Sequence, residues 1–205
     1  MNHDEIIYGG KKTGAKKAVI MLHGRGSIAS DILLLAEYLH IKDYLLAAPQ
    51  ATGNSWYPYS FLAPVAQNEP SLSSALGLVE KTLAGIESMG ITRENIFILG
   101  FSQGACLTLE FAARNAARYA GIIAFTGGLI GEHINRANYS GNFNQTPVFM
   151  GTSDPDMHVP VERVNLSAGI LEEMGADVTK QVYKHMGHTI SQLEIETVNK
   201  MFFTT

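Results

Sequence analysis

The chain has 205 residues, of which 46% are hydrophobic, enough for one well-filled core and short of two full domains. Its 15 Lys plus Arg and 19 Asp plus Glu give a formal net charge of −4, so it lacks the basic field that binds phosphate backbones. We therefore expect a single domain over residues 1–205 and no nucleic-acid partner.

Short apolar runs alternate with longer segments of helical periodicity along the whole chain. Continuous apolar runs are typical of strands that are covered on both faces. We predict such strands over residues 18–22, 44–48, 95–99, 121–125, 147–151 and 178–183. Residues 5–10 are a further candidate, for an antiparallel edge strand.

Helices are predicted where apolar residues recur at steps of three and four positions, because this spacing lines one face of a helix. The recurring residues are Leu76, Val79, Leu83 and Ile86; then Val164, Ala168, Leu171 and Met174; then Ile190, Leu193, Thr197 and Met201. Residues 105–119 add another helical segment. This alternation of strands and helices predicts an α/β fold with a mostly parallel sheet and helices on both faces.

Two long segments interrupt the alternation, residues 49–70 and residues 127–146. The first is rich in proline and aromatic residues and the second in glycine and asparagine, so both are candidates for binding loops. The alternative is that they are surface loops held by their own aromatic residues. We favour a pocket wall for Trp56, with the same two alternatives open for the other aromatic residues of the first segment.

A serine between two glycines, "GFSQG" at residues 100–104, follows a predicted strand and precedes a predicted helix. This context is the one required for a nucleophile elbow, in which a strained turn presents the Ser102 hydroxyl above the sheet. Side chains in place of Gly100 and Gly104 would collide with the neighbouring strand or helix. The pattern predicts that Ser102 is a catalytic nucleophile.

A serine hydroxyl needs a base within hydrogen-bond reach, and that base needs an orienting group. The reactive loops of parallel sheets follow the carboxyl ends of strands, where this chain places Asp154 and Asp156 and, one strand later, His185 and His188. We favour His188 as the base, because Gly187 before it allows a tight approach. The residue pattern leaves the choice between the two aspartates open.

Acyl transfer also requires hydrogen-bond donors for the oxyanion. The backbone N–H of Gln103 follows the nucleophile, and the glycine-rich "LHGRG" at residues 22–26 supplies a second donor through the backbone N–H of Arg25. The alternatives for this loop are a plain turn or a phosphate cradle. It lacks the Lys-Ser/Thr pair of a P-loop and the third glycine of a dinucleotide-binding motif.

Five motifs of the chain, taken in order, resemble those of the phospholipase/carboxylesterase family of α/β-hydrolases, which includes acyl-protein thioesterases. The motifs are "LHGRG", "APQ", "GFSQGA", "SDPDMHVP" and "YKHMGHTI". The resemblance runs from about residue 17 to the predicted C-terminal helix. It implies an α/β-hydrolase fold without a large lid domain and without a cofactor. The family's catalytic acid stands four residues before a proline, so Pro160 points to Asp156. The chain departs from the pattern at Met157 and has an extra carboxylate at Asp154.

The resulting hypothesis is a serine hydrolase that cleaves small carboxylic esters through Ser102, His188 and Asp156. An acyl thioesterase or a lysophospholipase would use the same three residues. A hydrolase fold retained as a binding module, with these residues idle, is the alternative from another class. The expected substrate is a small ester or thioester.

Other reactive side chains receive structural interpretations. We expect Cys106 to be a small core residue and His23 a hydrogen-bonded structural histidine. No third ligand accompanies His185 and His188, so no metal site is predicted. The single cysteine and the short apolar runs predict a cytoplasmic protein without stable membrane insertion. The apolar end of the chain, residues 201–205, suggests a contact within a homodimer.

Overall fold

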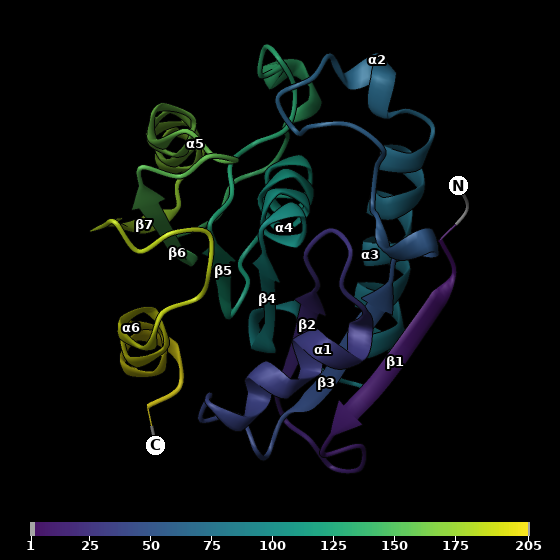
Figure 1. Cartoon of the computed structure of the whole chain (residues 1–205). Coiled ribbons are helices and arrows are strands. Elements are labelled where there is room, and N and C mark those ends of the chain that lie inside the picture. The colour runs from purple at the N-terminus through teal and green to yellow at the C-terminus, as the bar shows by residue number, and fades with distance from the viewer. Residues whose placement is uncertain (1–2, 205) are drawn as a thin grey trace.

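Residues 3–204, which the computed structural model describes, form a seven-stranded sheet with the strand order β1-β3-β2-β4-β5-β6-β7 (Figure 1). The edge strand β1 is antiparallel to β3, and all other neighbours are parallel. The strands are β1 (Glu5–Gly10), β2 (Ala18–Leu22), β3 (Leu45–Gln50), β4 (Ile96–Phe101), β5 (Gly121–Phe125), β6 (Pro147–Asp154) and β7 (Asp177–Lys184). The predicted strands, including the antiparallel edge strand, are thereby confirmed.

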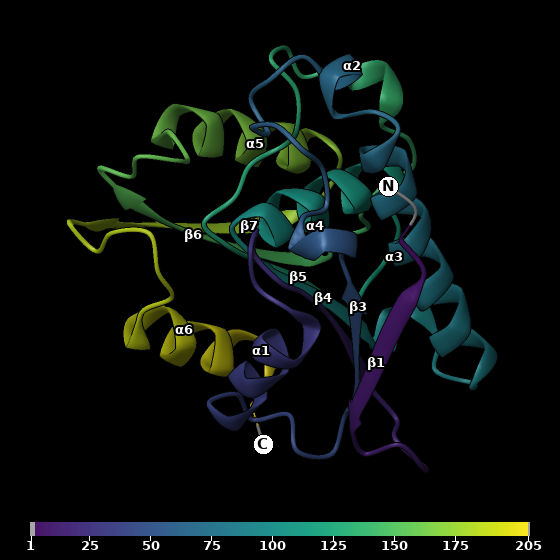
Figure 2. The ribbon, with the colours of Figure 1, turned by 45° about the vertical axis from the view of Figure 1, so that its right-hand side comes forward.

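Helices cover both faces of the sheet, as predicted (Figure 2). On one face lie α3 (Ser71–Ser88), α4 (Gln103–Arg114) and α5 (Val161–Glu173), and on the other lie α1 (Ala29–Leu34) and α6 (Gln192–Phe202). The short α2 (Val65–Asn68) belongs to the segment before α3. Strand β2 is buried along its whole length because side chains on both of its faces enter a core.

Two predicted helices are shorter in the structure. Helix α4 ends at Arg114 rather than at residue 119, because Asn115 leaves the helical conformation and its carbonyl accepts a hydrogen bond from the buried Tyr119 hydroxyl at 2.9 Å. Helix α6 begins after Ile190, because the Ser191 side chain caps it at residue 191. In both places a polar group competes with the backbone for helical hydrogen bonds.

The apolar end of the chain packs against its own core. Phe202 and Phe203 are buried, and their rings lie 6.2 and 5.1 Å from that of Phe97 on β4. The expectation that this end forms a contact with a second copy is therefore wrong for these two rings. Thr205 lies outside the described residues.

Candidate active site

Ser102 stands at the turn between β4 and α4 with φ 55° and ψ −117°, a conformation that is rare for residues with a side chain. A Cβ on Gly100 would lie 2.3 Å from the Gly104 carbonyl oxygen, and a Cβ on Gly104 would lie 2.1 Å from that of Leu22. The predicted steric reason for both glycines therefore holds. The start of α4 is pressed directly against the end of β2.

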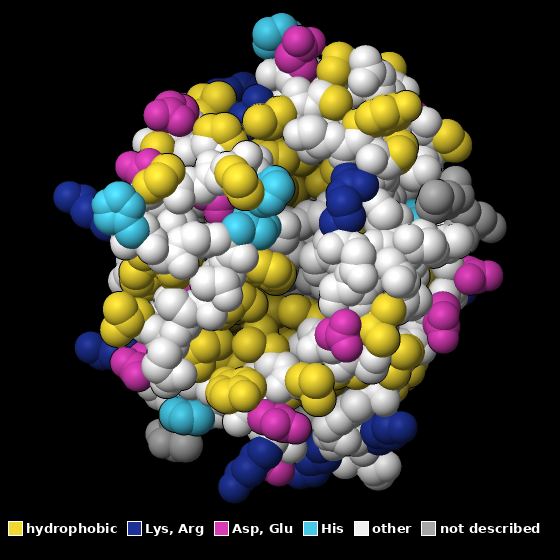
Figure 3. Space-filling view, viewed as in Figure 1, with side chains coloured by type: hydrophobic (Ala, Val, Ile, Leu, Met, Phe, Trp, Pro, Cys, Tyr) yellow, Lys and Arg dark blue, Asp and Glu magenta, His cyan; other side chains and the backbone are white. Residues whose placement is uncertain are grey.

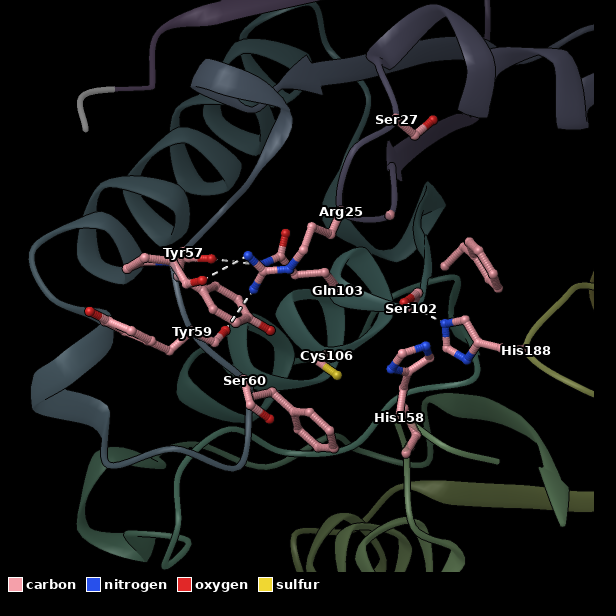
Figure 4. Close-up of a pocket in the computed structure, with 15 residues that line it drawn as sticks. Arg25, Ser27, Tyr57, Tyr59, Ser60, Ser102, Gln103, Cys106, His158 and His188 are labelled. Carbon is pink, nitrogen blue, oxygen red and sulfur yellow. Dashed lines mark hydrogen bonds between the residues drawn. The ribbon is translucent and has the colours of Figure 1, made fainter. Parts of the chain in front are cut away.

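His188 connects Ser102 to a carboxylate. Its Nε2 lies 2.7 Å from Ser102 Oγ, and its Nδ1 lies 2.8 Å from Asp156 Oδ2 (Figure 4 shows the first pair). The Asp156 side chain has no exposed surface, and its Oδ1 accepts the backbone N–H groups of His158 and Val159 at 2.7 and 2.9 Å. Burial raises the pKa of the Asp156 carboxyl, but these hydrogen bonds outweigh it and lower the pKa overall. A carboxylate at this place holds a proton on Nδ1, which leaves Nε2 as an acceptor for the serine proton.

The alternative residues lie apart from this arrangement. The side chains of Asp154 and His185 are exposed, and their hydrogen bond runs through the backbone, from the His185 N–H to the Asp154 carbonyl at 3.1 Å. The geometry therefore brings Asp156 and His188 together with Ser102, and it leaves Asp154 and His185 at the surface.

Ser153, at the end of β6, fixes the two loops that carry the acid and the base. Its hydroxyl accepts the backbone N–H of Gly187 at 3.0 Å and contacts the carbonyl oxygen of Pro155 at 3.2 Å. Gly187 has φ 79°, the left-handed region that favours glycine, but a Cβ there would meet nothing within 4 Å. The expected tight approach at Gly187 is therefore wrong, and backbone conformation is the reason for a glycine before His188.

The His188 ring is held between two other rings. The Phe101 ring lies 5.4 Å from it, and the His158 ring lies 4.8 Å from it at an angle of 71°. His158 is exposed and faces the same cavity, yet sequence reasoning missed it. Its position two residues after Asp156 was the available signal.

The loop after β2 is fixed by buried hydrogen bonds. His23 Nε2 accepts the N–H of Ala51 at 3.1 Å, so the proton is on Nδ1, which lies 2.8 Å from the Gly24 carbonyl oxygen. Burial lowers the pKa of His23 and keeps it neutral. The His23 carbonyl accepts the Trp56 indole N–H at 2.8 Å. His23 thus has the structural role expected of it, and it orients the loop that carries Arg25.

A cavity of about 510 Å³, called the cleft below, opens beside Ser102. Figure 3 shows a hollow on this face, with histidine side chains on one side and a Lys or Arg side chain on the other. Tyr57, Tyr59 and Phe61 line the cleft, but Trp56 does not, because it is fully buried beneath the loop and bound to His23. Segment 49–70 therefore provides a wall, and the pocket role expected for Trp56 is wrong.

The second long segment, residues 127–146, packs against the protein rather than lining the cleft. The Ile130 N–H donates to the buried carboxylate of Glu110 at 3.1 Å, and the Gly131 N–H donates to the Phe61 carbonyl at 2.7 Å. In the described residues this segment supports the wall from behind.

Cys106 lies at the floor of the cleft and is almost fully buried. Burial raises the pKa of its thiol to about 12, so the thiol remains neutral and unreactive at physiological pH. Among residues 3–204, no group of three or more His, Cys, Asp or Glu side chains is placed to hold a metal ion. In the same range, no helix has the length and apolar character needed to cross a membrane.

Comparisons with known proteins place the chain in a family. The family model for Phospholipase/Carboxylesterase matches residues 1–205. Acyl-protein thioesterase 1 of Saccharomyces cerevisiae is 29% identical over 89% of this chain and 89% of its own length, and a probable carboxylesterase of Arabidopsis thaliana is 27% identical over 89% and 76%. The crystal structure of a phospholipase/carboxylesterase from Dyadobacter fermentans is 55% identical, with a TM-score of 0.98 over 100% of this chain and 99% of that one.

Proposed function

The chain belongs to the phospholipase/carboxylesterase family, a family of carboxylic ester hydrolases, and we propose that it is a serine carboxylesterase acting on small esters. The observation that carries the proposal is the continuous line of hydrogen bonds from Asp156 through His188 to Ser102. On this proposal residues 1–205 act as one catalytic domain.

In the first step His188 Nε2 takes the proton of Ser102 as Oγ attacks the ester carbonyl carbon. The negative charge that develops on the carbonyl oxygen is received by the backbone N–H groups of Gln103 and Arg25. Gln103 is the first residue of α4, where a helix leaves N–H groups without intrahelical acceptors. His188 then gives its proton to the departing alkoxide, and an acyl-enzyme remains.

In the second step water attacks the acyl-enzyme with His188 again as the base, and the acid leaves. Only the neutral imidazole can accept a proton, so His188 acts as the base in its neutral form in both steps.

Small esters are placed first because Arg25 and Ser60 put polar groups on a wall that otherwise consists of aromatic and apolar side chains. A long alkyl chain lying against those polar groups would exchange their contact with water for contact with hydrocarbon. The second candidate is an acyl thioesterase, which is favoured by the name of the yeast relative at 29% identity. A lysophospholipase would use the same three residues.

The deciding experiment is hydrolysis of p-nitrophenyl esters from acetate to palmitate, run beside a palmitoyl thioester and a lysophospholipid, with Ser102→Ala as control. Serine-dependent turnover that peaks at short chains supports the carboxylesterase. A preference for the thioester or for long chains moves the other candidates ahead. If an organophosphonate probe fails to label Ser102 and no substrate is turned over, the idle binding module becomes the better hypothesis.

We also propose a cytoplasmic location, which is supported by the single cysteine, because it cannot form an internal disulfide. The homodimer stays a prediction, to be tested by light scattering. Phe202 and Phe203 no longer favour it, because both side chains are buried within the chain's own core.

A further inference from the structure

Arg25 is the one permanently charged side chain among the described residues that line the cleft. The lining also contains His158 and His188, and it contains no Asp or Glu in the described part of the chain. Asp156 is hidden behind His188 and has no exposed side-chain surface. Arg25 forms no ion pair with any described residue. A fixed guanidinium therefore faces the cleft without a carboxylate to compensate it.

The Arg25 guanidinium is held in a defined place. Nη1 donates to Ser55 Oγ at 3.0 Å and to the Pro58 carbonyl at 2.8 Å, and Nη2 donates to the Tyr59 carbonyl at 2.6 Å. The guanidinium carbon lies 6.0 Å from the centre of the Tyr57 ring. All these acceptors are neutral, so they orient the group and leave its positive charge intact.

Part of the guanidinium remains available to a ligand. Arginine has five N–H donors, and the contacts above use three of them. Within residues 3–204 the Nε–H and one N–H of Nη2 have no acceptor. The residue is exposed at the cleft. An oriented guanidinium with free N–H groups is a typical partner of a carboxylate.

The position of Arg25 assigns it to the acyl side of the substrate. His188 must protonate the departing alkoxide, so the leaving group lies beside His188. Figure 4 shows the Arg25 guanidinium across the cleft from His188, above the floor formed by Cys106. The acyl group extends away from His188, toward Tyr57 and Arg25.

We propose that Arg25 is a specificity-determining residue that binds a carboxylate on the acyl group, so that the preferred substrates are monoesters of short dicarboxylic acids. This inference rests on the proposed esterase function. For monomethyl succinate, Ser102 Oγ bonds to the ester carbonyl carbon while the bond to the methoxy oxygen breaks. Methanol leaves with the proton from His188, and water then releases succinate.

The test compares three methyl esters of similar length by pH-stat titration at low salt. Monomethyl succinate carries the carboxylate, dimethyl succinate replaces it with a neutral ester, and methyl butyrate lacks it. We expect kcat/KM for monomethyl succinate to exceed that for dimethyl succinate by about tenfold, as for a hydrogen bond to a charged group. Added salt should reduce this preference, because it screens the attraction.

Variants separate recognition from support of the loop. Arg25→Gln keeps hydrogen-bond donors and removes the charge, so the preference should fall to near unity, mainly through KM. Arg25→Lys keeps the charge and should retain part of the preference. The matched control is Arg118→Gln, which removes the same charge from another exposed arginine. Arg118 donates a hydrogen bond to the carbonyl of Asn144, which precedes β6 and lies at the end of the sheet opposite Ser102. Its preference should equal that of the wild type.

Two results would overturn the inference alone. One is equal or faster turnover of the neutral esters by the wild type. The other is an Arg25→Gln variant that loses activity equally on all three esters, which would mean that Arg25 only supports the loop. Absence of Ser102-dependent turnover of every ester would reject the esterase proposal and this inference with it.

Discussion

The Asp156→Asn substitution tests the proposed triad through the tautomer of His188. Asp156 Oδ1 accepts two backbone N–H groups, from His158 and Val159, and Oδ2 faces His188 Nδ1 at 2.8 Å. In the amide, the oxygen must stay with the two backbone donors, so the NH2 group faces His188. Nδ1 then has to accept, and the proton moves to Nε2, where it prevents proton transfer from Ser102.

The size of the effect follows from the cost of the opposite amide orientation. Turning the amide oxygen toward His188 would restore the productive tautomer but leave the backbone N–H groups of His158 and Val159 without that acceptor. Each unmade hydrogen bond costs roughly 1–3 kcal/mol, so the productive arrangement lies about 2–6 kcal/mol higher. With tenfold for about 1.4 kcal/mol, kcat/KM should fall by about 30-fold to 10⁴-fold.

The assay is kcat/KM for p-nitrophenyl acetate, with circular dichroism to show that the variant folds. Asp154→Asn is the matched control, because that side chain is exposed and makes no hydrogen bond in the described structure, so its loss should stay within about twofold. A large loss in Asp154→Asn together with wild-type activity in Asp156→Asn would refute the assignment of the acid.

Further predictions concern stability and reactivity. Gly104→Ala should lower stability by at least about 2 kcal/mol in thermal unfolding, because its Cβ would meet the Leu22 carbonyl oxygen at 2.1 Å. Gly77→Ala in α3, where a Cβ meets nothing within 4 Å, should instead stabilise the protein by about 0.5–1 kcal/mol. Cys106 should react with a thiol reagent at about pH 8 only after unfolding, because burial raises its pKa to about 12. Burial also raises the pKa of Glu194, so the free energy of unfolding of the wild type should fall as pH rises through that pKa. In denaturant titrations, the stability of Glu194→Gln relative to the wild type should therefore increase with pH.

Sequence patterns predicted the sheet well because each strand is a continuous apolar run, as in the fully buried β2. They also predicted the turn that carries Ser102, because a side chain at Gly100 or Gly104 would collide with the backbone of neighbouring segments. The choice of Asp156 over Asp154 came from the family resemblance. The two aspartates are two residues apart, and which of them faces His188 depends on the backbone conformation of the folded loop. The local sequence pattern does not determine that conformation.

The burial of the individual aromatic residues of segment 49–70 could not be predicted from the local sequence. Sequence reasoning favoured Trp56 for the pocket wall, yet Trp56 is fully buried while Tyr59 is 56% exposed. The difference in burial depends on partners more than 30 residues away in the chain, such as the His23 carbonyl that accepts the Trp56 indole N–H. The same is true of His158, whose ring contacts that of His188, 30 residues away in the chain.

The oxyanion donors and the acyl wall form one structural unit. The Gln103 side chain accepts the backbone N–H of Trp56 at 3.0 Å and donates to the Tyr57 carbonyl at 2.8 Å. The Arg25 side chain donates to the carbonyls of Pro58 and Tyr59. The two residues proposed to stabilise the oxyanion through their backbones therefore fix the wall through their side chains. Recognition of the acyl group and stabilisation of the oxyanion are thus assigned to different atoms of the same loop, the first to the Arg25 side chain and the second to its backbone N–H. This division is the reason why Arg25→Gln should change the preference among esters while the oxyanion donor remains.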